Sequence, residues 1–398
     1  MHITMALQGI TKIAFLWRFA LALVIVMLFT PNATLAKRST KMAAGLNVNV
    51  IDRCWRWNPN WRSNRQQLAT CSVGFAGKMT NNIGRGLIQY VVTDSSDNPL
   101  NPKPGTLRYG ATMIGGKKWI TFQRSMNIKL EKPLLISSFT TIDGRGAEVH
   151  IAGNACLMIY KENNIIIHGL RIHHCKPQAP SSVMGPGSKI MAVGQVDGDA
   201  IRLVTASKVW LDHNTLYKCS DGLLDVTRGS TEITISNNWF RYQDKVMLLG
   251  HDDGYMRDKN MKVTLMYNHF GPNCNQRMPR IRYGYAHVVN NLYQGWMQYA
   301  IGGSMTPSVK SQANLFIAPK SGNKEVTWRK SSEGKTGSWK FFSVDDVFEN
   351  GASFVQSNAG GTKPGYSREQ DFAVVDARYV RSLTKSSGAL RCTPRSKC

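Results

Sequence analysis

The sequence predicts an all-β fold, a β-solenoid in which short strands stack as successive coils. Five segments share one design, a short β-rich run that closes on an asparagine, and they end at Asn214, Asn238, Asn268, Asn291 and Asn314. These asparagines are 24, 30, 23 and 23 residues apart. A repeat of this length built from strands suits a coil of three strands with intervening turns. The alternative, a β-sandwich, predicts turn signals every ~8 to 12 residues without such a register.

The repeated asparagine is interpreted as structural. Asparagine tolerates the left-handed conformation at a bend, and its side chain can hydrogen-bond along a stack of identical residues. The inward Ile, Val, Leu and Phe side chains of successive coils then form one continuous core.

The first 36 residues predict a secretory signal peptide. Lys12 and Arg18 precede an apolar run, Phe19 to Phe29, and the small residues Thr34 and Ala36 suit a cleavage site. The run is shorter than the ~20 apolar residues needed to span a bilayer. We therefore expect cleavage before Lys37, no membrane contact afterwards, and a secreted protein.

The remaining chain is predicted to have three parts. Residues 37–105 form an N-terminal cap and the lead into the coils, within which residues 59–71 are predicted to form a short helix over the first coil. Residues 106–316 form the β-helix with its site loops. Residues 317–398 lose the repeat and are expected to be an irregular wrap over the other end, because a solenoid needs covered ends.

Eight cysteines in an exported chain indicate disulfides. Three pairs lie close in sequence: Cys54 with Cys71, Cys156 with Cys175, and Cys392 with Cys398. Cys219 and Cys274 could bridge or stay free. Neither Cys-x-x-Cys spacing nor a Cys/His cluster is present, which disfavours a zinc site.

The charge predicts an anionic partner. The formal net charge is +25, and removing the signal takes away two of the 50 basic residues and no acid, which leaves 48 against 25, or +23. Such a surplus acts at long range on nucleic acid, membrane or acidic polysaccharide, although it can also serve solubility alone. Secretion and the dispersed placement of the basic residues disfavour nucleic acid and favour an acidic polysaccharide.

Acidic side chains cluster in two short segments, at Asp197, Asp199, Asp221 and Asp225. An Asp-Gly pair alone indicates an ordinary turn, but this one recurs one coil later. An oxygen-only cluster in a chain poor in acids suits Ca²⁺. Residues 176–196, which lack strand periodicity, lead into it as a loop lining a site. Arginines follow at 277, 280 and 282 and point to an anionic ligand.

These motifs resemble those of plant pectate lyases, in polysaccharide lyase family 1, and among them the conifer (cedar and juniper type) pollen allergens. The resemblance runs from about Asn49 to Thr327. It rests on ThrIleAspGlyArgGlyAla at 141–147, AspGlyAspAlaIle at 197–201, TrpLeuAspHisAsn at 210–214, SerAspGlyLeuLeuAsp at 220–225, ValMetLeuLeuGlyHisAspAsp at 246–253, GlnArgMetProArg at 276–280 and TyrAlaIleGlyGly at 299–303. It implies a right-handed parallel β-helix that cleaves de-esterified pectin with Ca²⁺.

The resemblance also implies roles for single residues. Asp197, Asp221 and Asp225 match the calcium carboxylates, with Asp199 as a further ligand once substrate is bound. Arg277 matches the base, while Arg282 and Lys245 match substrate-binding residues. The chemistry is consistent, because β-elimination removes a proton beside a carboxylate whose charge a cation neutralises. The residues alone leave open that Arg277, Arg282 and Lys245 only clamp an anionic chain.

We therefore expect a secreted, monomeric, Ca²⁺-dependent pectate lyase of the cell wall that binds polygalacturonate and releases unsaturated oligogalacturonides. One alternative is a non-catalytic, allergen-type β-helix protein that holds pectate without cutting it. A second is a hydrolase built around His251, Asp252 and Asp253, but the further paired aspartates that hydrolysis requires are missing. Asp212 and His213 superficially suggest an acid/base pair, and we interpret both as structural.

Overall fold

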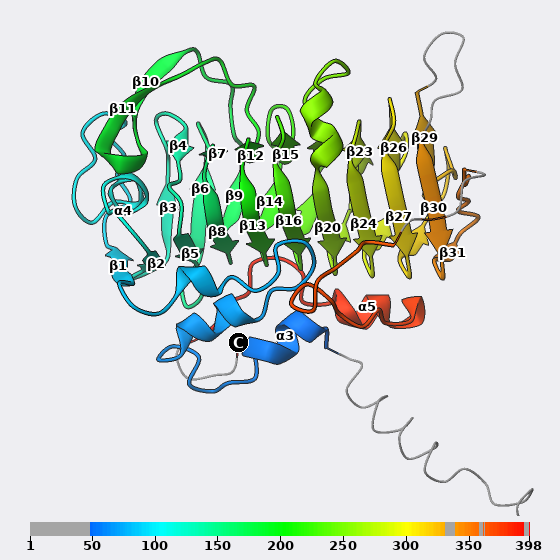
Figure 1. Ribbon diagram of the computed structural model, residues 1–398, viewed down its shortest axis with the longest axis horizontal. Coiled ribbons are helices and arrows are strands. Elements are labelled where there is room, and N and C mark those ends of the chain that lie inside the picture. The colour runs from blue at the N-terminus through cyan, green and yellow to red at the C-terminus, as the bar shows by residue number, and fades with distance from the viewer. Residues whose placement is uncertain (1–47, 331–338, 358–360, 362, 394–397) are drawn as a thin grey trace, which may run out of the picture. The chain divides into compact units, whose positions relative to one another are not determined.

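In the computed structural model, which describes residues 48–330, 339–357, 361, 363–393 and 398, the chain winds into coils stacked along one axis (Figure 1). Each complete coil gives one strand to each of three parallel sheets, which we call sheets 1, 2 and 3. The predicted signal peptide lies outside the described residues. Among the described helices, none has the length and apolarity that a membrane crossing requires.

Sheet 1 has ten strands, in the order β1 (Ile88–Val92), β2 (Lys118–Phe122), β5 (Thr140–Asp143), β8 (Asn163–His168), β13 (Ser207–Asp212), β16 (Thr231–Ser236), β20 (Lys262–Met266), β24 (Tyr285–Val289), β27 (Ser308–Gln312) and β30 (Lys340–Val344). Sheet 2 has eight, β4 (Leu134–Leu135), β7 (Leu157–Tyr160), β12 (Ile201–Val204), β15 (Leu224–Thr227), β19 (Met247–Leu249), β23 (Arg280–Ile281), β26 (Ile301–Gly303) and β29 (Thr327–Arg329). Sheet 3 has nine, β3 (Met126–Ile128), β6 (Val149–Ala152), β9 (Arg171–His173), β14 (Thr215–Tyr217), β17 (Trp239–Arg241), β21 (His269–Phe270), β25 (Leu292–Gln294), β28 (Leu315–Ile317) and β31 (Val347–Glu349).

Two small ribbons and several short helices complete the fold. The ribbons are the antiparallel hairpin of β10 (Ser181–Gly185) and β11 (Lys189–Val193), and the parallel pair β18 (Gln243–Lys245) and β22 (Cys274–Gln276). The α-helices are α3 (Val50–Trp55), α4 (Leu107–Thr112) and α5 (Val380–Leu383), and the 3₁₀ turns are η1 (Arg65–Thr70), η2 (Thr80–Asn82), η3 (Pro186–Ser188), η4 (Met256–Asn260) and η5 (Ala377–Tyr379).

The architecture is a right-handed parallel β-helix, which confirms the predicted solenoid and makes the sandwich alternative wrong. Alternate residues of each strand point inward, as Leu224 and Val226 do on β15, and join one apolar core that runs through the coils. The residue between them, Asp225, points outward. Sheet 2 therefore presents a row of outward side chains along the axis.

The asparagine repeat forms a ladder of buried side chains at the bends between sheets 1 and 3. The backbone N–H of each ladder residue donates to the side-chain Oδ1 of the next at 2.8–2.9 Å, from Asn214 through Asn238, Asn268, Asn291 and Asn314. The last step is different, because the Asn314 N–H donates at 2.7 Å to the carboxylate of Asp346. The ladder satisfies buried backbone donors at each bend, which confirms the structural interpretation of these asparagines.

The expectation that the repeat ends near residue 316 is wrong. β29, β30 and β31 add a further turn to all three sheets. The sequence hides this turn because Asp346 takes the place of the ladder asparagine. Residues 176–196 were likewise expected to be an unstructured loop, but they contain the β10–β11 hairpin around Pro186 and Gly187.

The coverage of the coils also differs from expectation. Only η1 is helical within residues 59–71. Its Leu68 does not cap the first coil. It packs with Ile51 and Trp55 against outward side chains of sheet 1, such as Trp210. The first coil is closed by α4, whose Leu107 and Ala111 join the central core. The side chain of Thr106 caps the first turn of α4 by accepting from the N–H of Tyr109.

The last described residues run back along the outside of the coils instead of wrapping one end. The carbonyl of Val375 accepts from Asn290, Ser387 donates to the carbonyl of Tyr267, and the N–H of Gly388 donates to the carbonyl of Asn237. Each of these bonds lies one coil further toward the N-terminus than the one before it. The segment therefore ties several coils together from the side.

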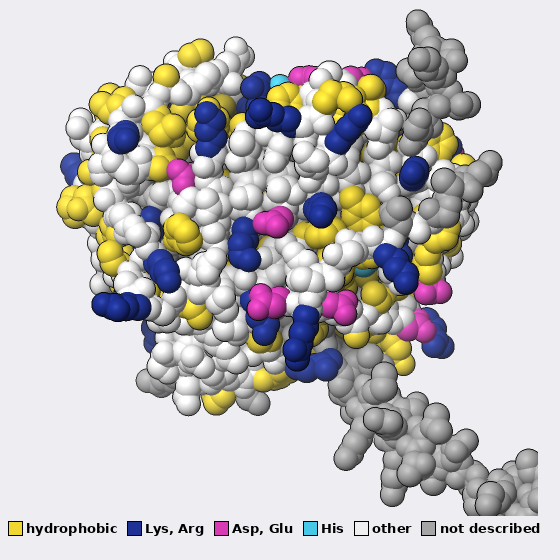
Figure 2. Space-filling view, in the orientation of Figure 1, with side chains coloured by type: hydrophobic (Ala, Val, Ile, Leu, Met, Phe, Trp, Pro, Cys, Tyr) yellow, Lys and Arg dark blue, Asp and Glu magenta, His cyan; other side chains and the backbone are white. Residues whose placement is uncertain are grey.

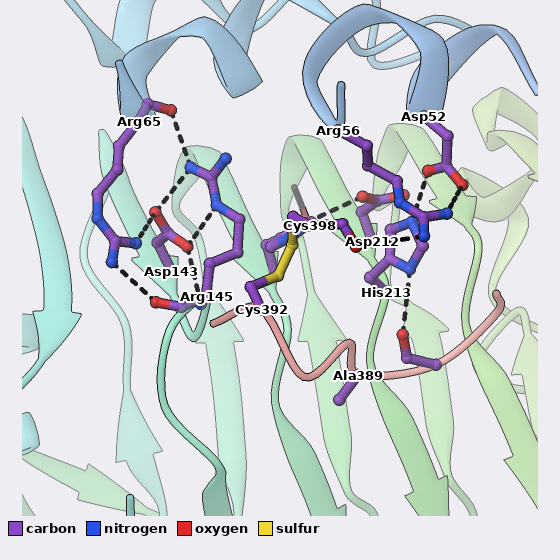
Figure 3. Close-up of a disulfide and its surroundings, with 12 residues drawn as sticks. Asp52, Arg56, Arg65, Asp143, Arg145, Asp212, His213, Ala389, Cys392 and Cys398 are labelled. Atoms are coloured by element: carbon purple, nitrogen blue, oxygen red, sulfur yellow. Dashed lines mark hydrogen bonds and ion pairs between the residues drawn. A yellow bond between two sulfur atoms is a disulfide. The ribbon is translucent and has the colours of Figure 1, made fainter. Parts of the chain in front are cut away.

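All three predicted disulfides are present, and Cys219 and Cys274 are free and buried. The Cys392–Cys398 disulfide lies beside a buried ion cluster on His213 (Figure 3). His213 Nδ1 is 3.1 Å from the carbonyl oxygen of Gly388, and Nε2 is 2.7 Å from a carboxylate oxygen of Asp52. A carbonyl only accepts, and so does an ionised carboxylate, so both ring nitrogens carry hydrogen and His213 is an imidazolium. This confirms a structural role for His213.

The stability of the fold is expected to fall as the pH rises above about 6.5, the ordinary pKa of histidine. Burial alone would lower the pKa of His213, but the carboxylates of Asp52 and Asp212 raise it above that value. A group whose pKa is raised on folding stabilises fully below its unfolded pKa and loses this contribution as the pH passes the folded pKa. We expect His213→Gln to cost roughly 3 kcal/mol near pH 6 and to flatten this decline, as measured by denaturant unfolding at several pH values. An equally steep decline in the variant would contradict this account.

Candidate active site

The outward row of sheet 2 forms the candidate site. Strand pairing places Met158, Arg202, Asp225, Leu248 and Arg280 side by side on β7, β12, β15, β19 and β23. Adjacent strands lie about 4.8 Å apart. An apolar, a basic, an acidic, a second apolar and a second basic side chain therefore follow one another along a single line.

The turns before β12 and β15 bring the four predicted carboxylates together. Single ligand oxygens of Asp197, Asp199 and Asp221 lie within 4.8 Å of one another. Asp225 joins them from β15 across Gly222, whose backbone N–H donates to Asp199 Oδ1 at 2.8 Å. A Cβ at position 222 would lie 2.7 Å from Asp199 Oδ1 and 3.4 Å from Asp225 Oδ1, so only glycine leaves room between them.

The protonation of the cluster shows how strongly its members repel one another. Burial, followed by the neighbouring carboxylates, raises the pKa of Asp199 to about 9. Burial, with further repulsion from Asp197 and Asp221, raises the pKa of Asp225 to about 7 despite the attraction of Arg202. These carboxylates cannot all be ionised at neutral pH without a compensating positive charge.

The cluster fits a hard divalent cation. All its side-chain donors are carboxylate oxygens, the type that Ca²⁺ prefers. Asp199 Oδ2 is buried and has no hydrogen-bond partner, so its lone pairs remain available to a cation. The side chain of Asp197 is 55 % exposed, so the cluster is open to solvent and to a ligand on that side.

Two cations border the carboxylates. Lys245 Nζ lies 2.7 Å from Asp221 Oδ1, and Arg202 Nη1 lies 3.3 Å from Asp197 Oδ1. The sequence interpretation missed Arg202, although its place between the inward residues Ile201 and Leu203 is a signal that it points outward. Arg202 Nε is buried without a partner, so the guanidinium retains a free donor in the site.

The three arginines of residues 277–282 differ in their surroundings. Arg277 has a φ of 61° and keeps a buried Nε without a partner, and its charge opposes the rise that burial causes in the pKa of Tyr299. The positive charge of Arg277 lowers the pKa of Asp225, so the two side chains lie close enough to interact electrostatically. The sequence grouped these residues, and the structure brings Arg277 to the edge of the acidic cluster.

Arg282 is held by the loop that follows β19. Its Nε lies 3.1 Å from Asp253 Oδ1, and its Nη1 donates to the carbonyl of Gly250 at 2.9 Å. Arg280 lies in the outward row, with its guanidinium 5.4 Å from the Trp328 ring centre. Burial, followed by the charge of Arg282, lowers the pKa of Arg280. Strand pairing places Arg280 two strands from Asp225 in the outward row.

Asp212 is remote from these groups in its bonding. It is fully buried, accepts from Ser236 at 2.6 Å and faces His168 Nδ1 at 2.9 Å. The structural interpretation of this residue is therefore confirmed.

The site combines a cluster of acids, an open side and a row of guanidiniums on a β-helix. Together these features define a protein that binds an acidic polymer.

Comparison with known proteins identifies the family. The pectate lyase family model matches residues 65–389. "Probable pectate lyase 9" of Arabidopsis thaliana is 48 % identical over 355 residues, covering 88 % of this chain and 77 % of the relative, and "Pectate lyase 1" of Cryptomeria japonica is 46 % identical, covering 88 % and 94 %. The crystal structure of Jun a 1, the major allergen from cedar pollen, is 48 % identical with a TM-score of 0.83, covering 86 % and 99 %. The chain belongs to the pectate lyase family, and its activity is that of a pectate lyase.

Proposed function

We propose that the protein cleaves de-esterified pectin by Ca²⁺-dependent β-elimination and releases unsaturated oligogalacturonides. One observation carries this proposal: four carboxylates that repel one another gather around Asp225 of the outward row, beside arginines with unused donors. An acidic polymer bridged to the carboxylates by a cation would lie against those arginines. The predicted signal peptide and the disulfides support secretion and action in the cell wall, and we propose that the enzyme acts as a monomer.

The surface charge supports an acidic polymer as substrate. Lys and Arg side chains are dispersed over the face shown in Figure 2, with few acidic groups between them. The field of such a surface attracts a polyanion from a distance. The acidic cluster of Asp197, Asp199, Asp221 and Asp225 would repel the same polymer, unless a cation neutralises the cluster.

We assign the cation to these four carboxylates. A Ca²⁺ ion bound there would neutralise a substrate carboxylate and stabilise negative charge that develops on it during proton removal. Lys245 and Arg202 border the cluster and would bind substrate carboxylates on either side of it. Arg282, held in place by Asp253, would bind a further carboxylate with its remaining donors.

Arg277 is proposed as the base. It takes the proton from C5 of a galacturonate, the electron pair of that C–H bond forms the C4–C5 double bond, and the bond from C4 to the glycosidic oxygen breaks. The leaving oxygen takes a proton from water. The left-handed backbone at Arg277 fixes the direction in which its side chain leaves the chain.

The proposal is tested by incubating the protein with polygalacturonate and following the ultraviolet absorbance of the unsaturated product. We expect product in the presence of Ca²⁺. Reducing ends without the absorbance would show hydrolysis. Pectate binding without any cleavage would support the non-catalytic wall protein instead.

A further inference from the structure

A second hollow lies beside the acidic cluster, between the β10–β11 hairpin and sheet 2. Its volume is about 170 Å³, and it is lined by Leu135, Met158, Tyr160, Met191, Ala192, Val193 and Gly194. None of these lining residues carries a charge. The hairpin packs Val183 and Val193 against Leu135, so the hollow has an apolar floor and an apolar wall.

The hollow continues the line of the active site. Met158 also lines the small hollow that contains Asp199, Arg202 and Lys176. On sheet 2, Met158 pairs with Arg202, and Arg202 pairs with Asp225. Met158 is therefore two strands from Asp225, or roughly 10 Å along the axis. A 1,4-linked hexose unit is about as long as one strand spacing, so a chain bound to the carboxylate cluster would place a sugar near the hollow about two units away.

The chemistry of the lining selects what that sugar can carry. A free carboxylate placed there would lose its water and find only one donor among the lining side chains, the neutral hydroxyl of Tyr160, which is costly. A methyl ester has no charge and exposes a methyl group that gains from burial against Met and Leu. A sugar that is O-acetylated on the ring keeps its free carboxylate and would pay the same penalty.

We propose that this hollow is a subsite for a methyl-esterified galacturonate, located about two sugars from the cleaved bond. The inference rests on the proposed function, since it assumes that the substrate chain follows the outward row. The enzyme would then prefer partly esterified pectin that pairs a free carboxylate at the cation with an ester at the hollow. The hairpin of residues 181–193 would be the element that reads this pattern.

The test compares two substrates, polygalacturonate and a partly methyl-esterified pectin, through the ratio of their kcat/KM values. Met191→Glu places a carboxylate in the wall of the hollow and is expected to lower the ratio of esterified to free substrate about tenfold. Ile190→Glu is the matched control, because this neighbouring side chain is 64 % exposed and does not line the hollow. It should leave the ratio unchanged. Met191→Gln, which adds polarity without charge, replaces Met191→Glu if thermal unfolding shows that Met191→Glu is not folded.

Two outcomes would overturn the subsite. A ratio unchanged in the Met191 variants, or one lowered equally by Ile190→Glu, would show that the hollow does not read the ester. A pectin esterified by acetyl groups that behaves like the methyl-esterified one would assign the hollow to apolar substituents in general and would also reject this proposal. If the parent forms no product, the proposed function fails, and calorimetric binding of short methyl-esterified and free oligogalacturonates to the same variants still decides the subsite.

Discussion

Replacement of Arg277 by lysine is expected to lower the rate of unsaturated product formation at least about a hundredfold, while polygalacturonate affinity changes only a few-fold. Lysine keeps the positive charge beside the acidic cluster. It lacks the planar guanidinium, whose Nε is buried without a partner. The substitution should therefore remove the base and preserve the electrostatic attraction. Stopped and continuous absorbance assays give the rate, and calorimetry gives the affinity.

Two further variants separate the base from a simple clamp. Lys245→Ala removes a cation beside Asp221 and is expected to raise KM more than it lowers kcat, because it weakens the hold on a polyanion. Arg378→Lys makes the same exchange as at position 277 on a side chain that is 78 % exposed and paired with Asp376, and should change neither value. Near-normal product formation by Arg277→Lys would show that Arg277 only binds the substrate and is not the base.

Chelation of divalent cations is expected to abolish cleavage, and added Ca²⁺ to restore it, without unfolding the protein. The four carboxylates offer only oxygen ligands and repel one another, so the empty cluster would neither bind nor neutralise a uronate. Stability should survive, because the apolar core runs through all the coils. Product absorbance and the thermal unfolding curve are measured on the same chelated sample.

Mg²⁺ serves as the matched control for this experiment. It is smaller, prefers octahedral geometry and gives up its water reluctantly, so it should restore little activity. Full cleavage in excess chelator would remove the cation from the mechanism. Loss of cooperative unfolding on chelation would instead make the cation a structural element.

The β-helix was predictable from the repeat because each coil must satisfy the same buried backbone N–H at its bend. An asparagine at Asn214, Asn238 and Asn268 meets that need with one side chain, and the spacing becomes visible in the sequence. The last turn was missed because Asp346 meets the same need with a different residue. A repeat recognised by its residue type is missed where a different residue accepts the same hydrogen bond.

The carboxylates were predictable because the Asp-Gly pairs recur one coil apart. Arg202 was missed because its role depends on which way a strand residue points and on what lies beside it in the next coil. The hairpin at residues 181–193 was missed because its two strands are short, and its apolar side chains match sheet 2 instead of a neighbour in sequence. Contacts between a coil and an inserted hairpin depend on packing between residues far apart in the sequence, and a local sequence pattern does not predict them.

The backward path of the last residues has a consequence for synthesis on the ribosome. Coils can stack one on another as they emerge, because each needs only its predecessor. The side of the stack is completed last, when Gly388 reaches His213 and the carbonyl of Cys398 accepts from Arg56, which follows α3. Residues separated by more than 340 positions thus join only after nearly the whole chain has been translated. A growing chain spends most of its synthesis with outward apolar groups such as Trp210 only partly covered, and it depends on its last residues to close the protein against aggregation.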